Sequence, residues 1–323
     1  MREVPTALVQ LLSENRVGVP LDLGICGGSF SEVEVSIEAL PLVSTHRGYR
    51  LVGNRDWFLK LYRSPRMGAE REVRILGHLA GVACVPEFGG AIVEREPAGA
   101  GAVLGMIQRW ESGGNLWAVL EKGGVDSLGA FDGASLGRSL RELHRAMACI
   151  GVDALSADGG LRTLEDEMRQ SLLSVEEAVI ERWIDTMRDL RGTGFLADGT
   201  SVIHGDMHLG QVLLTGEGRH LFFDFEGEPH VNVEGAGLVG ECPLRDVAGM
   251  LRSFGYLGDA LGCADPIRAM KATFLEGYFP DGMGERDERL LKAFCVQRAF
   301  REWLYERAHR PDWAQRPLRV PLF

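Results

Sequence analysis

Apolar and polar positions alternate through three short runs in the first part of the chain, which predicts β-strands. The runs cover residues 35–40, 49–52 and 57–62, and Gly53-Asn54-Arg55-Asp56 supplies a turn between the last two. The period then changes, because Glu72, Ile75, Leu76 and Leu79 recur at helical spacing within residues 67–79. A further short apolar run at 103–107 completes a β-rich segment that contains one helix.

Helical spacing dominates after residue 110. Residues 136–150 place Leu136, Leu140, Leu143 and Met147 on one stripe, and 163–192 and the segment from Pro243 onward also favour helices. The predicted fold class is therefore α+β. We expect a β-rich N-terminal lobe over residues 1–110 and a mostly helical C-terminal lobe over 111–323, with polar loops at their junction.

One segment interrupts the helical pattern between residues 201 and 226. Apolar runs at 201–203 and 212–214 flank the polar loop His204-Gly205-Asp206-Met207-His208-Leu209-Gly210-Gln211, and a turn at 215–218 precedes the run 221–223. This order predicts strand, loop, strand, turn and strand. Loops held between strands can present polar groups in fixed positions.

Composition limits the classes of partner. The 323 residues include 35 Lys and Arg against 46 Asp and Glu, and the net charge of −11 opposes nonspecific binding to nucleic acid or to an anionic membrane. No apolar run reaches about 18 residues, and residues 1–5 lack a signal-peptide pattern. We expect a soluble, cytoplasmic protein. The six scattered cysteines are expected to be reduced core residues.

The residue types in the polar loop suit phosphoryl transfer. An aspartate in such a loop can orient and deprotonate an acceptor hydroxyl, and an amide five residues later can help to hold Mg²⁺. Asp206 and Gln211 have this spacing. Asp224, in Asp-Phe-Glu, is placed to bind Mg²⁺ between the β- and γ-phosphates of ATP, and Glu226 to add a metal or water contact. The alternative is a solvated loop whose acidic residues cap helices.

A lysine in an apolar strand and a glutamate on the next helix form a second constellation. Lys60 lies between Leu59 and Leu61, and Glu72 lies on the apolar face of residues 67–79. Each charge is costly to bury alone, so we predict that the two residues pair and that Lys60 orients phosphates. Glu70 is a fallback partner. The alternative is that Lys60 extends to the surface and that Glu72 is an ordinary helix residue.

The phosphate loop has two candidates. Ser44-Thr45-His46-Arg47-Gly48 joins two predicted strands just before Lys60, so the hydroxyls of Ser44 and Thr45 and nearby amides could hold phosphate. A structural turn is an equal alternative for this segment. Cys26-Gly27-Gly28-Ser29 is richer in glycine but lies too far before Lys60 for a strand–loop–strand arrangement.

With these residues in place, the chain resembles the maltokinases within the aminoglycoside-phosphotransferase-like branch of the kinase fold. The resemblance covers most of residues 49–318. It rests on the loop 204–211, on Asp224-Phe225-Glu226-Gly227-Glu228-Pro229, on the segment 243–254, and on Tyr305-Glu306-Arg307-Ala308-His309-Arg310-Pro311-Asp312-Trp313.

The resemblance implies a bilobal protein-kinase-like fold, ATP and Mg²⁺ as cofactors, and phosphorylation of a small sugar, foremost maltose to maltose 1-phosphate. It also implies a link to trehalose or glycogen enzymes. Residues 104–117 resemble the hinge, so backbone groups around Gln108 and Trp110 would meet adenine. Maltokinases carry a longer N-terminal region, which leaves the sugar open.

The last predicted helix offers candidates for the acceptor site. Glu302, Tyr305, Glu306 and His309 form a polar stripe with Trp303 beside it, and His208 lies next to the loop aspartate. Carboxylates can accept sugar hydroxyls, and an aromatic ring can cover the sugar's C–H face. A solvated stripe is an equal alternative. Two alternative functions are a glucosamine, other amino-sugar or aminoglycoside kinase, and a noncatalytic pseudokinase that binds nucleotide.

Overall fold

The computed structural model describes residues 5–15, 23–32, 34–41, 46–62, 67–96, 99–155, 178–188, 200–227 and 238–322. The chain forms two compact units. The first contains residues 1–113, 215–217 and 221–235, and the second contains 114–214, 218–220 and 236–323. The segment that carries Asp224 thus returns to the first unit, a return that a division near residue 110 does not include.

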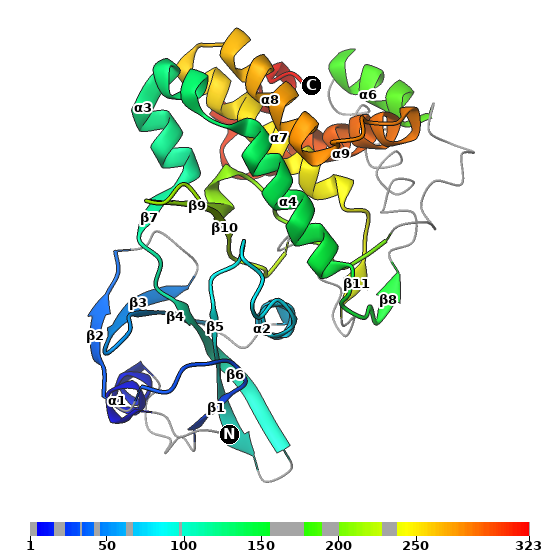
Figure 1. Cartoon of the computed structure of the whole chain (residues 1–323). Coiled ribbons are helices and arrows are strands. Elements are labelled where there is room, and N and C mark those ends of the chain that lie inside the picture. Colours follow the sequence, from blue (N-terminus) through cyan, green and yellow to red (C-terminus); the bar gives the residue numbers. More distant parts are fainter. Residues whose placement is uncertain are drawn as a thin grey trace. The chain divides into compact units, whose positions relative to one another are not determined.

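The first unit is built on an antiparallel sheet (Figure 1). Its strands in the described residues are β1 (Leu23–Cys26), β2 (Ser36–Ala39), β3 (Arg47–Val52), β4 (Trp57–Leu61), β5 (Phe88–Glu96) and β6 (Gly99–Arg109), in the order β1-β5-β6-β4-β3-β2. The predicted strands at 35–40, 49–52, 57–62 and 103–107 are confirmed. Their alternation buries one face, where Leu51, Leu59 and Ile107 are each 0% exposed.

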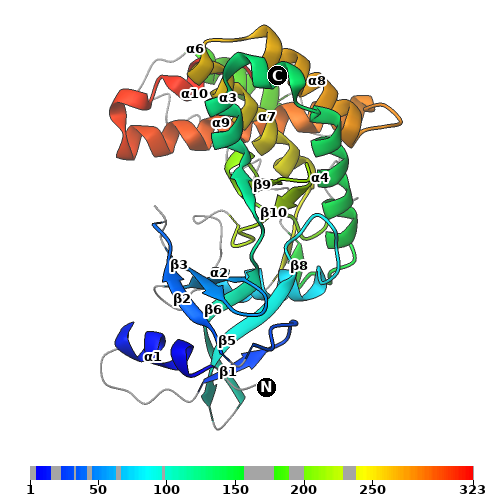
Figure 2. The same ribbon diagram turned by 60° about the vertical axis from the view of Figure 1, so that its left-hand side comes forward.

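Two helices pack on this sheet. Helix α1 (Thr6–Asn15) contacts β2, and α2 (Met67–His78) contacts β5 and β6 (Figure 2). The predicted helix at 67–79 is confirmed, and its apolar face buries Ile75, Leu76 and Leu79 together with Glu72. The sequence pattern did not predict α1, β1 or β5.

The glycine pair after β1 has a structural role. The amide nitrogens of Ser29 and Phe30 donate to the carbonyls of Phe88 and Gly89, at 3.0 and 2.9 Å. A Cβ atom on Gly28 (φ +63°) would lie 2.2 Å from the carbonyl carbon of Gly89, so only glycine allows this approach. Residues 26–29 therefore form a turn against β5. The preferred phosphate loop, residues 44–48, is a different segment.

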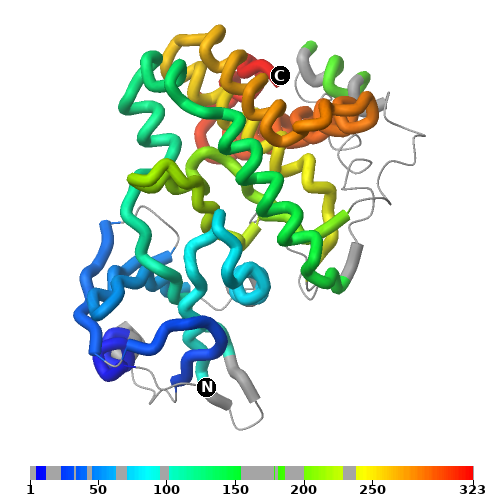
Figure 3. The backbone as a smooth tube through the Cα atoms, viewed as in Figure 1, coloured from blue at the N-terminus to red at the C-terminus, as the bar shows by residue number. Residues whose placement is uncertain are grey.

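The second unit is mainly helical (Figure 3). Its helices in the described residues are α3 (Leu116–Ala130), α4 (Gly133–Met147), α6 (Ala178–Arg188), α7 (Leu244–Leu261), α8 (Asp265–Tyr278), α9 (Glu285–His309) and α10 (Arg316–Arg319), with short 3₁₀ turns at Leu209–Gln211 and Pro311–Trp313. Helix α4 packs on α8, and α7 packs on both α8 and α9. Leu136, Leu140, Leu143 and Met147 are all 0% exposed, which confirms the predicted stripe.

Short strands support the polar loop of this unit. They are β7 (Gly113–Asn115), β9 (Val212–Thr215) and β10 (His220–Phe222), which form the sheet β10-β9-β7, and the parallel pair β8 (Ala154–Leu155) and β11 (Val239–Gly240). The predicted strand at 201–203 is wrong. Ser201 makes an isolated bridge to Glu241, and the next amides bind a carboxylate instead of a neighbouring strand.

The predictions for residues 163–192, for the cysteines and for membrane spans have separate outcomes. Of the predicted helical residues 163–192, only 178–188 are described, as α6. All six cysteines are free, but only Cys84 and Cys295 are buried, so the core assignment holds for these two. Within the described residues, no helix is both long enough and apolar enough to span a membrane.

Candidate functional site

A lysine surrounded by three carboxylates lies in the first unit. Lys60 Nζ lies 2.9 Å from Glu72 Oε2, 2.6 Å from Asp224 Oδ1 and 2.5 Å from Glu226 Oε1. Strand β4 supplies Lys60, helix α2 supplies Glu72, and the segment after β10 supplies the other two. The predicted pair of Lys60 and Glu72 is confirmed, so the fallback partner is not needed. Both residues are buried, with Lys60 7% and Glu72 0% exposed.

Glu72 is held by further hydrogen bonds. Tyr62 donates its hydroxyl to Glu72 Oε2 at 2.7 Å, and the Phe225 amide donates to Oε1 at 3.1 Å. Both carboxylate oxygens therefore have partners within the protein, as a buried carboxylate requires. Glu72 thus fixes Lys60 and also anchors the Asp-Phe-Glu segment to α2.

The cluster sets the charge states of its members. Burial alone would lower the pKa of Lys60, but Glu72, Asp224 and Glu226 more than offset it, and the lysine pKa is raised. Burial raises the pKa of Glu72 against the opposing effect of Lys60. The pKa of Glu226 is lowered despite burial, because His46 and Lys60 stabilise its charged form. Three acidic groups against one lysine leave a surplus of negative charge.

The backbone at Asp224 is strained. Among the described residues, Asp224 is the one non-glycine with a positive φ, at 68°. A side chain in this region costs on the order of 1–3 kcal/mol, and such residues persist where their surroundings hold them. Arg71 donates to the carbonyl of Phe225, and the Phe225 amide is bound by Glu72. The structure therefore holds the Asp224 carboxylate in a set direction.

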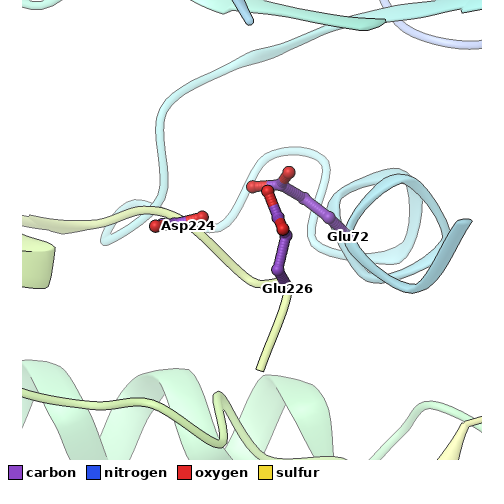
Figure 4. A group of neighbouring side chains, drawn as sticks. All are labelled: Glu72, Asp224 and Glu226. Atoms are coloured by element: carbon purple, nitrogen blue, oxygen red, sulfur yellow. The ribbon is translucent and has the colours of Figure 1, made fainter. Parts of the chain in front are cut away.

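The acidic groups fit a divalent cation. One oxygen from each of Glu72, Asp224 and Glu226 lies within 4.8 Å of the others, and Figure 4 shows the three side chains grouped together. Hard cations such as Mg²⁺ prefer carboxylate oxygens. Because both Glu72 oxygens already accept hydrogen bonds, Asp224 and Glu226 are the better ligands. The third expected ligand, Gln211, lies in the second unit at the end of a 3₁₀ turn.

The expected nucleotide contacts are described in part. Ser44 and Thr45 lie outside the described residues. The neighbouring His46 is described, and its Nε2 lies 2.8 Å from Glu226 Oε1. This contact joins the β2–β3 connection to the acidic cluster, and no sequence pattern predicts it.

The expected hinge lies at the end of β6. The amide of Arg109 donates to the Glu87 carbonyl at 2.7 Å, and that of Trp110 donates to the Asp56 carbonyl at 3.0 Å. These two N–H groups are therefore occupied within the protein, and the expectation that backbone groups around Gln108 and Trp110 meet adenine stays a prediction. The side chain of Gln108 is buried, and its Oε1 has no hydrogen-bond partner among the described residues.

In the second unit, a buried aspartate on α7 shapes the polar loop. Asp246 accepts hydrogen bonds from the amides of His204 and Gly205, at 2.7 and 2.9 Å. His144 Nε2 lies 3.1 Å from the same carboxylate. Burial would raise the pKa of Asp246, but His144, His204 and the Gly205 amide lower it below its usual value. The charged carboxylate thereby fixes the backbone just before Asp206.

The rest of the loop is held by local contacts. Ser253 accepts from the Leu209 amide at 3.1 Å, and His208 Nδ1 accepts from the Gly210 amide at 3.0 Å. A Cβ atom on Gly249 would lie 2.3 Å from the Met207 carbonyl, so glycine allows α7 to approach the loop. Gln211 is 9% exposed. These contacts place Asp206 at a rigid turn.

Replacing Asp246 with asparagine is expected to destabilise the protein by about 2 kcal/mol at pH 7, because hydrogen bonds to a charged group are stronger than those to a neutral one. A carboxylate with a lowered folded-state pKa stabilises above its unfolded pKa, ordinarily 3.8, and this stability is lost as the pH falls through the folded value. The deficit should therefore shrink towards pH 3. Urea unfolding of both proteins at pH 7, 5 and 3.5 measures it, and a constant deficit would contradict the assignment.

The polar stripe on α9 is only partly available to a ligand. Glu302 accepts from Arg252 at 2.8 Å and from Tyr256 at 3.1 Å, and Glu306, 8% exposed, pairs with Arg310. Tyr305 is 45% exposed and stacks on His309. Trp303 does not offer its ring to a sugar, because it is 1% exposed and packs in the core.

An arginine that was not predicted contacts the Asp206 carboxylate. Arg298, on α9, donates to Asp206 Oδ1 at 2.8 Å. No sequence motif indicates a role for Arg298. Its only signal is the spacing of four residues to Glu302, which is common on solvated helices.

The chain is similar to known phosphotransferases. The model of the phosphotransferase enzyme family matches residues 36–227. The glucosamine kinase of Mycolicibacterium smegmatis is 31% identical over 211 residues, which cover 57% of this chain and 51% of that protein. The chain therefore spans about half the length of this curated relative.

Solved structures share the fold. A glucosamine kinase in complex with glucosamine, ADP and inorganic phosphate matches with a TM-score of 0.68 at 22% identity, over 98% of this chain and 83% of that one. A thermostable variant of an aminoglycoside phosphotransferase, in a ternary complex with ADP and hygromycin B, gives 0.58 at 16% identity, over 88% and 91%. The expected α+β, kinase-like fold is confirmed.

Proposed function

The chain belongs to the phosphotransferase enzyme family, and from this premise we propose that it is an ATP-dependent kinase that phosphorylates a hydroxyl of a small sugar. The observation that carries the proposal is the buried contact of Lys60 with Glu72 and Asp224, at 2.9 and 2.6 Å. A lysine fixed by a helix glutamate and placed beside a metal-binding aspartate is the arrangement that kinases use for phosphates. The presence of Asp206 as well argues against a noncatalytic nucleotide-binding protein.

The first unit would hold the nucleotide. Lys60 would contact the phosphates, with Glu72 as its positioning partner, and Ser44 and Thr45 would complete the phosphate contacts. For adenine we favour Gln108, whose buried Oε1 has no partner among the described residues and could accept from the exocyclic amine. The carbonyl of Trp110 is a further candidate, since its N–H is occupied.

Asp224 and Glu226 would hold Mg²⁺. The assignment of Gln211 as a further ligand stays a prediction. When bound, Mg²⁺ would neutralise charge on the β- and γ-phosphates. Lys60 is surrounded by more carboxylates than it can neutralise, which suits cation binding. A bound cation could take over Asp224 and Glu226 as ligands from Lys60.

The second unit would supply the base. The acceptor hydroxyl oxygen forms a bond to the γ-phosphorus, the bond from that phosphorus to the bridging oxygen of ADP breaks, and the hydroxyl proton passes to Asp206. Asp206 would also orient the hydroxyl before transfer. The hydrogen bonds from His204 and Gly205 to Asp246 support this role, because they keep the loop backbone fixed.

For the acceptor we favour an amino sugar such as glucosamine over maltose. The curated relative at 31% identity is a glucosamine kinase, and the comparisons give no support to the maltose expectation. The proposed acceptor contacts remain His208, Glu302, Tyr305 and Glu306, and Tyr305 is the most exposed of the four at 45%. A link to trehalose or glycogen enzymes stays a prediction.

Turnover with a sugar panel tests the function. ATP consumption would be measured with glucosamine, glucose, maltose and an aminoglycoside, and we expect glucosamine to give the highest kcat/KM. Preference for maltose would reverse the choice of acceptor. No turnover with any sugar, while ATP still raises the melting temperature, would refute the kinase proposal.

A further inference from the structure

We propose that Arg298 is a positioning residue for Asp206, a role that rests on the proposed function. Arg298 donates to Asp206 Oδ1 at 2.8 Å, and its Nε lies 3.4 Å from Glu302 Oε1 on the next turn of α9. One guanidinium therefore joins the proposed base to a second carboxylate. The planar fork of arginine suits such a double contact, since its donors have fixed directions.

Further contacts restrict the position of Arg298 through Glu302. Glu302 Oε2 accepts from Arg252 at 2.8 Å and from Tyr256 at 3.1 Å. Arg252 is 0% exposed, and it also donates to the backbone carbonyls of Val320 and Pro317, at 2.8 and 3.1 Å. This chain of contacts runs from a buried anchor through Glu302 to Arg298, so Arg298 has little freedom to leave Asp206.

The contact restricts the one part of Asp206 that the loop leaves undetermined. Asp246 fixes the backbone before Asp206, but it does not fix the side-chain torsions. Arg298 donates to Oδ1, and this contact restricts the side-chain torsions of Asp206. His208 Nε2, a proposed acceptor contact, lies 3.9 Å from Oδ2. The acceptor hydroxyl would therefore meet Oδ2.

Exposure supports a positioning role over a structural one. The side chains of Arg298 and Asp206 are 23% and 25% exposed, unlike the buried Arg252. Ion pairs that water can reach add less to folding stability than buried ones lose when broken. The effect of Arg298 should therefore fall on the rate of transfer, because small displacements of a catalytic group can cost about 10²-fold.

The assignment predicts a specific kinetic pattern. Arg298→Ala should lower kcat by roughly 10–100-fold, leave KM for ATP within about twofold, and leave the melting temperature nearly unchanged. Arg298→Lys should lower kcat less than Arg298→Ala does. Added guanidinium ion should partly restore the kcat of the alanine variant. In an Asp206→Asn background, Arg298→Ala should have little further effect, because the group that it positions no longer acts as a base.

Arg307→Ala is the matched control, since it removes an exposed arginine from the same helix, one that lies over Trp303. It should leave kcat unchanged. A kcat for Arg298→Ala within twofold of the wild type would overturn the proposal. So would equal, independent losses in the wild-type and Asp206→Asn backgrounds.

A crystal structure of Arg298→Ala separates this proposal from the proposed function. We expect Asp206 in a different rotamer or in more than one conformer, and an unchanged carboxylate would overturn the positioning role even if the enzyme is a kinase. If the wild type phosphorylates no sugar, the proposed function fails. The crystal structure then decides by itself whether Arg298 orients Asp206.

Discussion

Replacing Asp206 with asparagine is expected to slow transfer to the sugar by roughly 10²–10⁴-fold, the usual contribution of a general base. Asparagine keeps the shape and one carbonyl oxygen, so Arg298 retains an acceptor. The groups proposed to hold ATP, with Lys60 and Asp224 foremost, lie in the first unit. ATP affinity should therefore change little. Steady-state kinetics for the sugar and calorimetric titration with ATP measure the two effects.

A surface aspartate supplies the control for this substitution. Asp265 pairs with Arg268 at the start of α8, and its side chain is 86% exposed. Asp265→Asn removes the same charge from the second unit and should affect neither transfer nor ATP binding. If Asp206→Asn weakens ATP binding as much as it slows transfer, Asp206 is not primarily a base. Near-normal transfer would exclude the base assignment altogether.

Elements with a regular apolar period were predictable from the sequence. Strands β3 and β4 show apolar positions because one face packs on the core, and the stripe on α4 repeats because one face is buried. Strand β5 was missed, because neighbouring side chains such as Trp57 and Ile107 fill the space beside Gly89, so glycine stands where an alternating strand would show an apolar residue. The run 201–203 was wrongly predicted as a strand, because burial of its side chains is not accompanied by strand pairing of its backbone. Val202 and Ile203 are buried as a strand would be, but the backbone beyond them binds Asp246.

The part of the site that was predictable from the sequence is the pair of buried, opposite charges. Lys60 and Glu72 are each costly to bury alone, so their contact could be expected from residue types and order. Contacts that depend on tertiary structure gave no such signal. Arg298 lies 92 positions from Asp206 and His46 lies 180 from Glu226, and both are ordinary polar residues in their local sequence. The same holds for the occupied amides of Arg109 and Trp110, since strand register decides their partners.

Replacing Lys60 with methionine is expected to abolish productive ATP use and to destabilise the protein by about 3 kcal/mol, the usual cost of leaving one buried charge unpaired. Glu72 would keep its hydrogen bonds from Tyr62 and Phe225 but would lose its cation at 0% exposure. Its pKa is already raised by burial. Without Lys60 the pKa should rise further.

This loss of stability should depend on pH in a defined direction. A carboxyl group with a folded pKa above its unfolded value, ordinarily 4.5, destabilises the protein only where the unfolded chain is ionised. The deficit of Lys60→Met should therefore grow as the pH rises from 4.5 and level off above the folded pKa. Urea unfolding at pH 4.5, 6 and 7.5 measures this trend.

The double variant Lys60→Met, Glu72→Gln separates the lost pair from a general packing defect. Glutamine can still accept from Tyr62 or Phe225 and carries no charge, so the double variant should regain most of the stability and lose the pH dependence. It should still fail to use ATP, because the phosphate-binding cation is absent. A double variant as unstable as Lys60→Met at every pH would show that the methylene stem of Lys60, rather than its ion pair with Glu72, stabilises the first unit.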